Sequence, residues 1–422
     1  MNAMDEHPVR VTVTDDLERN RWTVFFRLLL AIPHFVWLAL WGVAAFVAAF
    51  VNWLVTLVDG RSPEPLFDFL AAYVRYATHV YAYVLFAANP YPGFKGEPGY
   101  PVDVELGRPQ PQNRWKTGFR IVLALPALAL ADALVGGAPS SWSAEGRSGG
   151  GSFSYTTSGA GVAFTVACLA WFAILARGRM PQGFRDLVAY CLRFAAQTWA
   201  YVFILTDRYP EADPALPRAV EPAPANPVRL ALEDDPRRSR LTVFFRLLLA
   251  LPHLVWLALW GIAAIFALIG IWVGTVVKGR PPAGLHRFLS SFLRYAIHVY
   301  AFLCLVGGPF PAFGGRPGTY PVEIELPPPG PQGRWGAFFR LVLAVPALAV
   351  NGALGIALLV SAVLSWFASL VTGREPLGLQ RLGAFALRYE AQTSAYLYLL
   401  TARYPYSGPW TQAADEQLML GE

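Results

Sequence analysis

Two sets of arginines recur at fixed spacing in this sequence, and they are the residues best suited to chemistry. The members of the first set follow a phenylalanine, and they are Arg27, Arg120, Arg246 and Arg340. Each stands among apolar and aromatic residues, as basic side chains do where they reach lipid phosphates at a membrane interface. Two interpretations stay open, which are general anchoring to the interface and a lipid headgroup-binding site shaped by four such helices.

The second set lies fourteen residues after a Gly-Arg-x-Pro turn, and each arginine is followed four positions later by histidine or glutamine. The pairs are Arg75 and His79, Arg193 and Gln197, Arg294 and His298, and Arg388 and Gln392. Residues four apart share one face of a helix, so each pair forms a candidate intramembrane polar cluster. A charge inside a membrane is costly and is paired or functional. A structural pair, for instance with Asp68, Glu390 or a carbonyl, and a path for a ligand or proton are both open.

Motifs of enzymes and metal proteins are not found in the sequence. It has no Walker loop, no GxGxxG and no HExxH or HxxxH spacing. The most apolar runs contain no paired carboxylates and no nucleophile beside a catalytic base. The three cysteines lie in apolar segments without CxxC spacing, as small buried hydrophobic residues do. We therefore expect no enzymatic activity, no metal, no cofactor and no nucleic-acid partner.

Both arginine sets belong to a module that occurs four times. The distance from the first arginine to the turn arginine is 34, 59, 34 and 34 residues. The odd modules resemble each other most, so the repeating unit is a pair of modules that was duplicated. The predicted first half is 1–210 (modules 9–99 and 100–210) and the second is 228–410 (modules 228–318 and 319–410). A Pro/Ala-rich linker, 211–227, joins the halves, and an acidic tail follows at 411–422.

The composition places the chain in a membrane. It is 55% hydrophobic and 15% charged with a mean hydropathy of +0.39, which is more apolar than a soluble core of this length requires. Four runs of 15 to 17 residues hold almost no charge, and they are Val43–Val58, Val162–Ala176, Ile262–Val277 and Ile356–Thr372. Their length is near the lower limit for crossing about 30 Å of hydrocarbon.

The fold class predicted is an α-helical integral membrane protein with a small β-sheet. Short alternating stretches precede the modules and predict strands, which we expect to pair into one four-stranded sheet. Each module would then have an interfacial helix kinked at its proline, an elbow at Gly42 or its equivalents Gly261 and Gly355, and two spans. This gives about eight transmembrane helices, with one long kinked helix per module or twelve spans as alternatives. The distribution of Lys and Arg places the strands and both termini in the cytoplasm, at the plasma membrane.

The pattern FFRxxxxxP, GRxP and RYxxH/Q resembles a domain-of-unknown-function family of bacterial multi-pass membrane proteins with tandem modules. The resemblance covers nearly the whole chain and implies membrane location and repeat architecture, but no activity. Two functions are open. The first is a non-enzymatic scaffold or lipid-interacting protein, with membrane lipids as partners and a protein partner at the cytoplasmic sheet or linker. The alternative is a transporter or lipid-handling protein with a cavity between two pseudo-symmetric halves.

Overall fold

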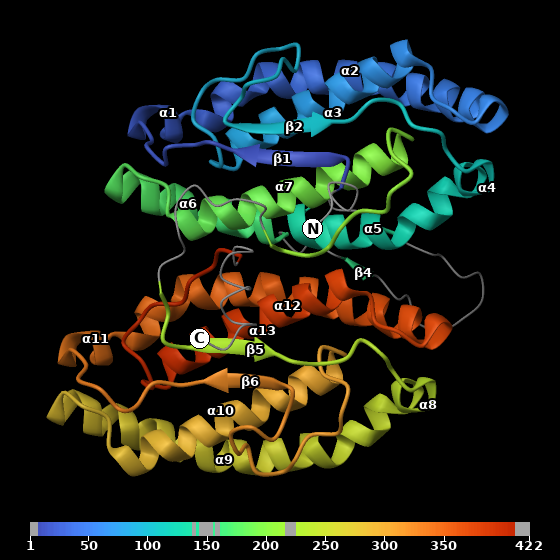
Figure 1. The fold of residues 1–422 in the computed structure, drawn as a ribbon. Coiled ribbons are helices and arrows are strands. Elements are labelled where there is room, and N and C mark those ends of the chain that lie inside the picture. Colours follow the sequence, from blue (N-terminus) through green and yellow to red (C-terminus); the bar gives the residue numbers. More distant parts are fainter. Residues whose placement is uncertain (1–6, 137–140, 143–154, 157–160, 216–224, 410–422) are drawn as a thin grey trace, which may run out of the picture. The chain divides into compact units, whose positions relative to one another are not determined.

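The chain forms two compact units, Met1–Glu211 and Ala212–Glu422, and each contains two modules (Figure 1). The computed structural model describes residues 7–136, 141–142, 155–156, 161–215 and 225–409. The predicted linker lies partly outside these residues and the predicted acidic tail wholly so.

The first unit begins with the elements of module one and continues with those of module two. Module one supplies β1 (Val9–Val13), α1 (Arg21–Phe25), α2 (Arg27–Asp59) and α3 (Glu64–Val84). Module two supplies β2 (Val102–Leu106), α4 (Arg114–Gly118), α5 (Arg120–Val135), β3 (Ser141–Trp142), β4 (Tyr155–Thr156), α6 (Val162–Arg177) and α7 (Gln182–Val202).

The second unit repeats this order with an uninterrupted helix in its second half. Module three supplies β5 (Arg229–Leu232), α8 (Arg240–Phe244), α9 (Arg246–Lys278) and α10 (Ala283–Leu303). Module four supplies β6 (Val322–Glu325), α11 (Arg334–Phe338), α12 (Arg340–Thr372) and α13 (Leu377–Leu397).

The Gly-Arg-x-Pro turn separates the two main helices of every module. Its glycine ends the first helix in the left-handed conformation, with φ between 70° and 74°, which glycine adopts without steric cost. Its proline stands directly before the second helix, where the fixed φ and the missing N–H do no harm. The turn residues are Gly60 and Pro63, Gly178 and Pro181, Gly279 and Pro282, and Gly373 and Pro376.

The first main helix of modules one, three and four is continuous, which corrects the predicted elbow. Helices α2, α9 and α12 are 33 residues long and run through Gly42, Gly261 and Gly355. Gly42 allows a close helix contact, because a Cβ there would lie 3.0 Å from the Tyr73 hydroxyl. The alternative of one long helix therefore describes these three modules.

Module two divides the same helix into α5 and α6, each 16 residues long. The two helix ends meet again in space, since a Cβ on Gly136 would lie 2.9 Å from the amide nitrogen of Gly161. The residues that flank the insertion, Gly136 and Gly161, therefore lie side by side.

Two separate sheets take the place of the predicted four-stranded sheet. In the first unit β1 pairs antiparallel with β2, and in the second unit β5 pairs antiparallel with β6. Each strand pairs with the strand of the other module in its own unit. The prediction assumed that four strands with unpaired edges would all pair with one another. Instead, each unit pairs its own two strands over its own helices.

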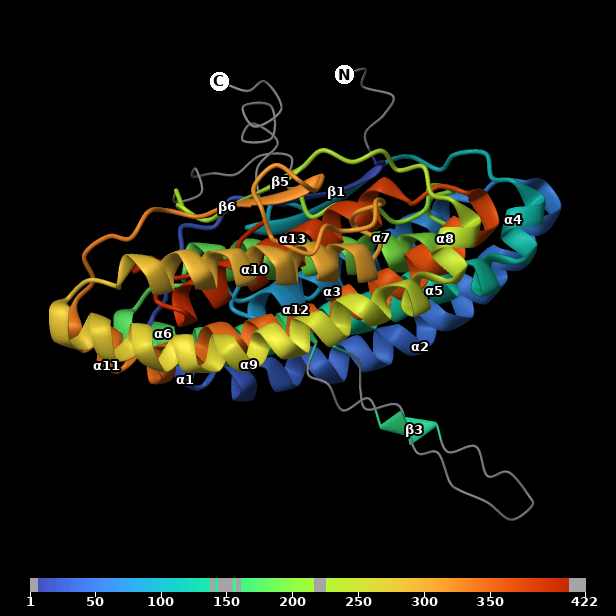
Figure 2. The same cartoon turned by 90° about the horizontal axis from the view of Figure 1, so that it is seen from below.

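Each unit consists of layers, which Figure 2 shows edge-on. The sheet rests on the 21-residue helices, α3 and α7 or α10 and α13, and these pack against the long helices. The long helices α2, α9 and α12 are, among the described residues, the three that are long and apolar enough to cross a membrane. The 21-residue helices are not among them, so eight spans are not found.

The two modules of a unit contact each other at both ends of the long helices. Arg19 N donates to Gly178 O (3.0 Å), and at the other end Gln112 N donates to Gly60 O (2.8 Å). The equivalent contacts in the second unit join Arg238 N to Gly373 O and Gln332 N to Gly279 O, at 2.9 and 2.8 Å. The segment that follows each strand thus meets the turn of the other module, whereas two spans per module would have placed the strands and the turns on opposite sides of the membrane.

Candidate functional site

The first arginine set is buried at the start of the long helices. Arg27, Arg120, Arg246 and Arg340 are 0 to 4% exposed. Each guanidinium carbon lies 4.0 to 4.4 Å from the centre of an aromatic ring on the neighbouring 21-residue helix, and the rings are Tyr83, Tyr201, Phe302 and Tyr396. This arrangement is a cation–π contact inside the protein.

These arginines bind the carbonyl ends of the 21-residue helices. Arg27 Nη1 donates to Tyr83 O (2.9 Å) and Ala88 O (3.1 Å), and Arg246 Nη2 donates to Gly307 O (3.2 Å). A cation is favourable at a helix C-terminus, where carbonyl groups lack partners. We call this arrangement the arginine clamp. It differs from the expected contact with lipid headgroups, because these guanidinium groups face protein carbonyls.

A strained turn explains why a clamp is needed there. The second residue after each 21-residue helix has a left-handed backbone although it is not glycine, and these residues are Phe86, Ile204, Leu305 and Leu399, with φ from 58° to 64°. Such a conformation is costly for a side chain with a Cβ and persists only where its surroundings hold it.

A second group, which sequence analysis did not identify, holds the carbonyl of each left-handed residue. Arg19 Nη2 donates to Phe86 O (2.9 Å) and Gln112 Nε2 donates to Ile204 O (2.9 Å). Arg238 and Gln332 do the same for Leu305 and Leu399. The signal in the sequence is an arginine or glutamine directly before the N-cap of each short helix.

The second arginine set lies beneath the sheets. In module one Arg75 Nε donates to Val104 O (2.9 Å), and Nε2 of His79 lies 2.8 Å from Oδ1 of Asp103. In module three Arg294 Nε donates to Glu323 Oε1 (2.6 Å), and Nε2 of His298 lies 3.7 Å from Oε2 of the same carboxylate.

The even modules replace the histidine by a glutamine that binds strand backbone. Gln197 Nε2 donates to Val9 O (3.1 Å) and Gln392 Nε2 donates to Val228 O (3.0 Å). Arg193 and Arg388 stand over the rings of Tyr190 and Phe385. These contacts support the structural alternative, in which the second set joins helix to sheet.

Arg75 and Arg294 bind carbonyls, which was one of the expected alternatives, whereas their carboxylate partners are not the expected Asp68 and Glu390. Asp103 and Glu323 belong to the alternating strand segments, whereas Glu390 accepts from Asn351 and from Ser394 within the helical layer. Burial alone would raise the pKa of the Glu323 carboxyl, but the nearby His298 imidazole and the hydrogen bonds from Gly318 and Arg294 lower it.

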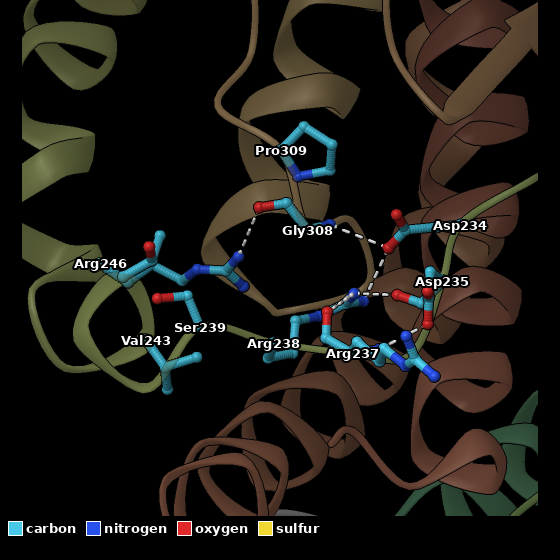
Figure 3. Close-up of a pocket in the computed structure, with 10 residues that line it drawn as sticks. Asp234, Asp235, Arg237, Arg238, Ser239, Val243, Arg246, Gly308 and Pro309 are labelled. Carbon is cyan, nitrogen blue, oxygen red and sulfur yellow. Dashed lines mark hydrogen bonds and ion pairs between the residues drawn. The ribbon is translucent and has the colours of Figure 1, made fainter. Parts of the chain in front are cut away.

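A pocket of about 260 Å³ lies where module three begins, and Figure 3 shows its lining. Asp234 accepts from Gly308 N (2.9 Å) and lies 2.7 Å from Arg238 Nη2. On the opposite wall Arg246 reaches the Gly308 carbonyl (3.1 Å). Its Nη1 has no hydrogen-bond partner among the described residues, unlike Nη1 of Arg27.

Glu375 closes the ion-pair network behind this pocket. Its Oε2 lies 2.7 Å from Arg238 Nη2, and the side chain is 1% exposed. Burial raises the pKa of the Glu375 carboxyl from 4.5 to about 7, against the opposing effect of Arg238. Module two has Met180 at this position of the turn.

A groove of about 350 Å³ lies inside the first unit, between α2, α3, α5 and α7. Its walls are mainly apolar, with Leu38, Leu128 and Trp199 from three of the helices, and Asp132 carries its one carboxylate. Ala195 also lines the groove, and its equivalent in module four is Glu390.

No metal site is evident in the parts of the chain that the structure describes, since no three His, Cys, Asp or Glu side chains converge there. The residues also form no catalytic arrangement that we recognise. The site residues therefore divide into clamps, helix-to-sheet contacts, one charged pocket and one apolar groove.

Comparison with known proteins identifies the repeated module. The family model described as a domain of unknown function (DUF4389) matches residues 21–95, 157–212, 240–313 and 334–408. The chain belongs to this family. The resemblance predicted from the sequence is thus confirmed, with four DUF4389 modules in tandem.

The DUF4389 matches cover the main helices, and the strands β1, β2, β5 and β6 lie outside the matched residues. Module two is matched only from residue 157, so its α5 and Arg120 lie outside the match. No curated protein and no solved structure matches the chain.

Proposed function

We propose that this DUF4389 protein is a non-enzymatic membrane scaffold that interacts with lipid. The exposed surface of the long helices carries the proposal. Between Leu28 and Val58 helix α2 has no charged residue, and its polar His34, Asn52 and Thr56 are buried. An exposed apolar surface of this extent is not stable in water and requires an apolar partner.

The opposite face of each unit is polar and suits a protein partner. The sheets expose Arg10 and Glu105 in the first unit and Arg229 and Glu325 in the second. A sheet face that exposes charged side chains is unfavourable for contact with lipid and favourable for recognition of a protein. We place this face and both termini in the cytoplasm, at the plasma membrane.

Headgroup recognition is proposed at Arg246 among the four arginines, because it lines the charged pocket and has an N–H without a partner. Arg238 and Asp234 place both signs of charge in the same pocket. A phosphate would pair with Arg246, and an amine of the same headgroup would pair with Asp234.

Native mass spectrometry of the protein extracted with its lipid tests this proposal. Arg246→Lys shortens the reach of the cation and removes the fork of N–H donors. We expect one bound phospholipid class to be lost in this variant. Arg27→Lys is the matched control, since it alters an equivalent clamp whose Nη1 is already occupied, and it should retain the lipid. Equal retention in both variants would reject recognition at Arg246.

Lipid handling by the apolar groove is the second candidate. The walls described above fit an acyl chain, and Asp132 and the Tyr73 hydroxyl could orient a polar end. Ala195→Phe should fill the groove and remove one bound lipid in the same experiment, whereas Ala391→Val in the second unit should not. Retention of that lipid in Ala195→Phe would remove this candidate.

A further inference from the structure

We infer that each unit lies flat in one leaflet of the membrane, with its long helices parallel to the surface and its sheet in water. This inference rests on the proposed contact between lipid and the long helices. It concerns how the protein meets the bilayer and replaces a spanning arrangement.

The length of the long helices is the first argument. A helix of 33 residues is about 50 Å long, whereas the hydrocarbon core is about 30 Å thick. A 50 Å helix fits 30 Å only at a tilt of roughly 53°, beyond the range of about 0 to 40° found for transmembrane helices. Exposed apolar residues occur along the full length, from Leu247 (73% exposed) to Val277 (63%). A spanning helix would leave some of them in water.

The position of the sheet is the second argument. Arg294 is near the middle of α10 and binds strand β6 through Glu323 and the carbonyl of Ile324 (3.3 Å). The exposed Glu325 at the end of β6 therefore lies beside the central part of the helices. If the helices stood upright, this carboxylate would lie at bilayer depth, where an exposed charge costs several kcal/mol. In the flat arrangement it faces water.

The thickness of the lipid-facing layer is the third argument. One layer of helices is about 10 Å thick, which fits within a leaflet whose hydrocarbon is about 15 Å deep. Amphipathic segments that lie in an interface bury their apolar face to about 5 to 10 Å. The long helices are more apolar than such segments, so they would lie deeper and be covered by the 21-residue helices.

The ends of the helices indicate which lipids would favour this arrangement. Exposed basic residues gather at both ends of the first unit, with Arg21, Arg177 and Arg179 at one end and Arg61, Arg114 and Lys116 at the other. In the flat arrangement both groups lie at the headgroups of the same leaflet. Anionic headgroups should therefore strengthen binding.

Depth measurements on the full-length protein test the inference. The vesicles contain phosphatidylcholine and phosphatidylglycerol, and flotation first establishes that the protein binds them. Cys168 and Cys304 are replaced by alanine, while the fully buried Cys191 is retained. A spin label is then attached at one of three exposed positions of α9, in the variants Leu247→Cys, Ile262→Cys and Val277→Cys, and power saturation reports its depth.

The flat arrangement predicts that the three labels lie within about 5 Å of the same depth. The spanning arrangement predicts that Ile262 lies roughly 14 Å from each of the other two along the membrane normal, because fifteen residues of helix separate them and the helix would be tilted by about 53°. A label at Glu325→Cys serves as control and should be accessible to water-soluble relaxation agents. A deep Ile262 with two shallow ends would overturn the flat arrangement and leave lipid contact intact. Failure to float would overturn both.

Discussion

In each module, one arginine joins the start of the first main helix to the end of the 21-residue helix. The guanidinium group satisfies carbonyls at the end of a helix, stacks on an aromatic ring and supports a residue with a strained backbone. Arg340 combines these contacts through Thr401 O (3.4 Å), Gln332 Oε1 (2.5 Å) and the ring of Tyr396. A lysine cannot make them all, because it is a point charge without a planar fork.

The first prediction concerns this clamp in module four. Arg340→Lys should lower the free energy of unfolding by about 2 kcal/mol, since it leaves buried carbonyls without partners. Equilibrium unfolding in mixed micelles measures this change. Arg61→Lys, at an exposed position of a turn, is the control and should change stability by less than about 0.5 kcal/mol. Equal effects would show that the clamp does not stabilise the module.

The second prediction concerns Glu375 and pH. Its pKa is about 7 in the folded chain against an ordinary 4.5, so the folded chain binds more protons between these values. Stability must therefore fall as pH rises from about 4.5 to 7, by about 3 kcal/mol at most. Glu375→Met copies the turn of module two and should remove most of this slope. Unfolding curves at pH 5, 6, 7 and 8, as chosen conditions, measure it, and an unchanged slope in the variant would exclude Glu375 as its source.

The residue types at the site could be predicted, but their partners could not. The fixed spacing in four modules identifies Arg27 and Arg75 as positions where an arginine has a specific role. Their partners are carbonyls such as Ala88 O and a strand carboxylate, Asp103, which only the folded chain brings near. The sequence pattern shows that an arginine recurs at a fixed position. Which protein groups surround that arginine in place of water depends on segments that are far apart in the sequence.

At the level of elements, the boundaries were easier to predict than the continuity of helices. The Gly-Arg-x-Pro turn and the alternating stretches place the helix ends and the strands of the two sheets correctly. The predicted elbow at Gly42, Gly261 and Gly355 is instead part of a continuous helix. The prediction of an elbow fails because a helix can accommodate an insertion whose two ends stay adjacent, as Gly136 and Gly161 show.

The third prediction tests this continuity. Deletion of residues 137–161 would restore the spacing of 34 between the first and the turn arginine of module two. We expect one uninterrupted helix and a stability within about 1 kcal/mol of the natural chain, because the register of α6 is preserved. Deletion of 137–160 is the matched control, since one extra residue rotates α6 by about 100° and turns its buried face outward. Unfolding in micelles compares the two, and equal stability of both would contradict a continuous helix.

At the level of the whole molecule, the pair of modules is the structural unit. Each module presents a turn that binds the segment ahead of the other module's short helix, and each strand needs the other module's strand. A single module would leave its strand edge and the segment before its short helix without partners, which is unfavourable for backbone groups. This reciprocity gives a physical reason why the modules were duplicated as pairs.

The same reciprocity leads to the last prediction, which concerns sidedness. Arg61 and Arg179 are exposed and lie in turns at opposite ends of the long helices of the first unit. If the helices lie flat, Arg61→Cys and Arg179→Cys must react with a membrane-impermeant maleimide from the same side. Labelling of sealed membrane vesicles of each orientation distinguishes the two sides. Leu40→Cys, on the lipid-facing surface, is the control and should react in neither preparation. Labelling of the two turn positions in opposite preparations would require the long helices to cross the bilayer, at a tilt that their length makes costly.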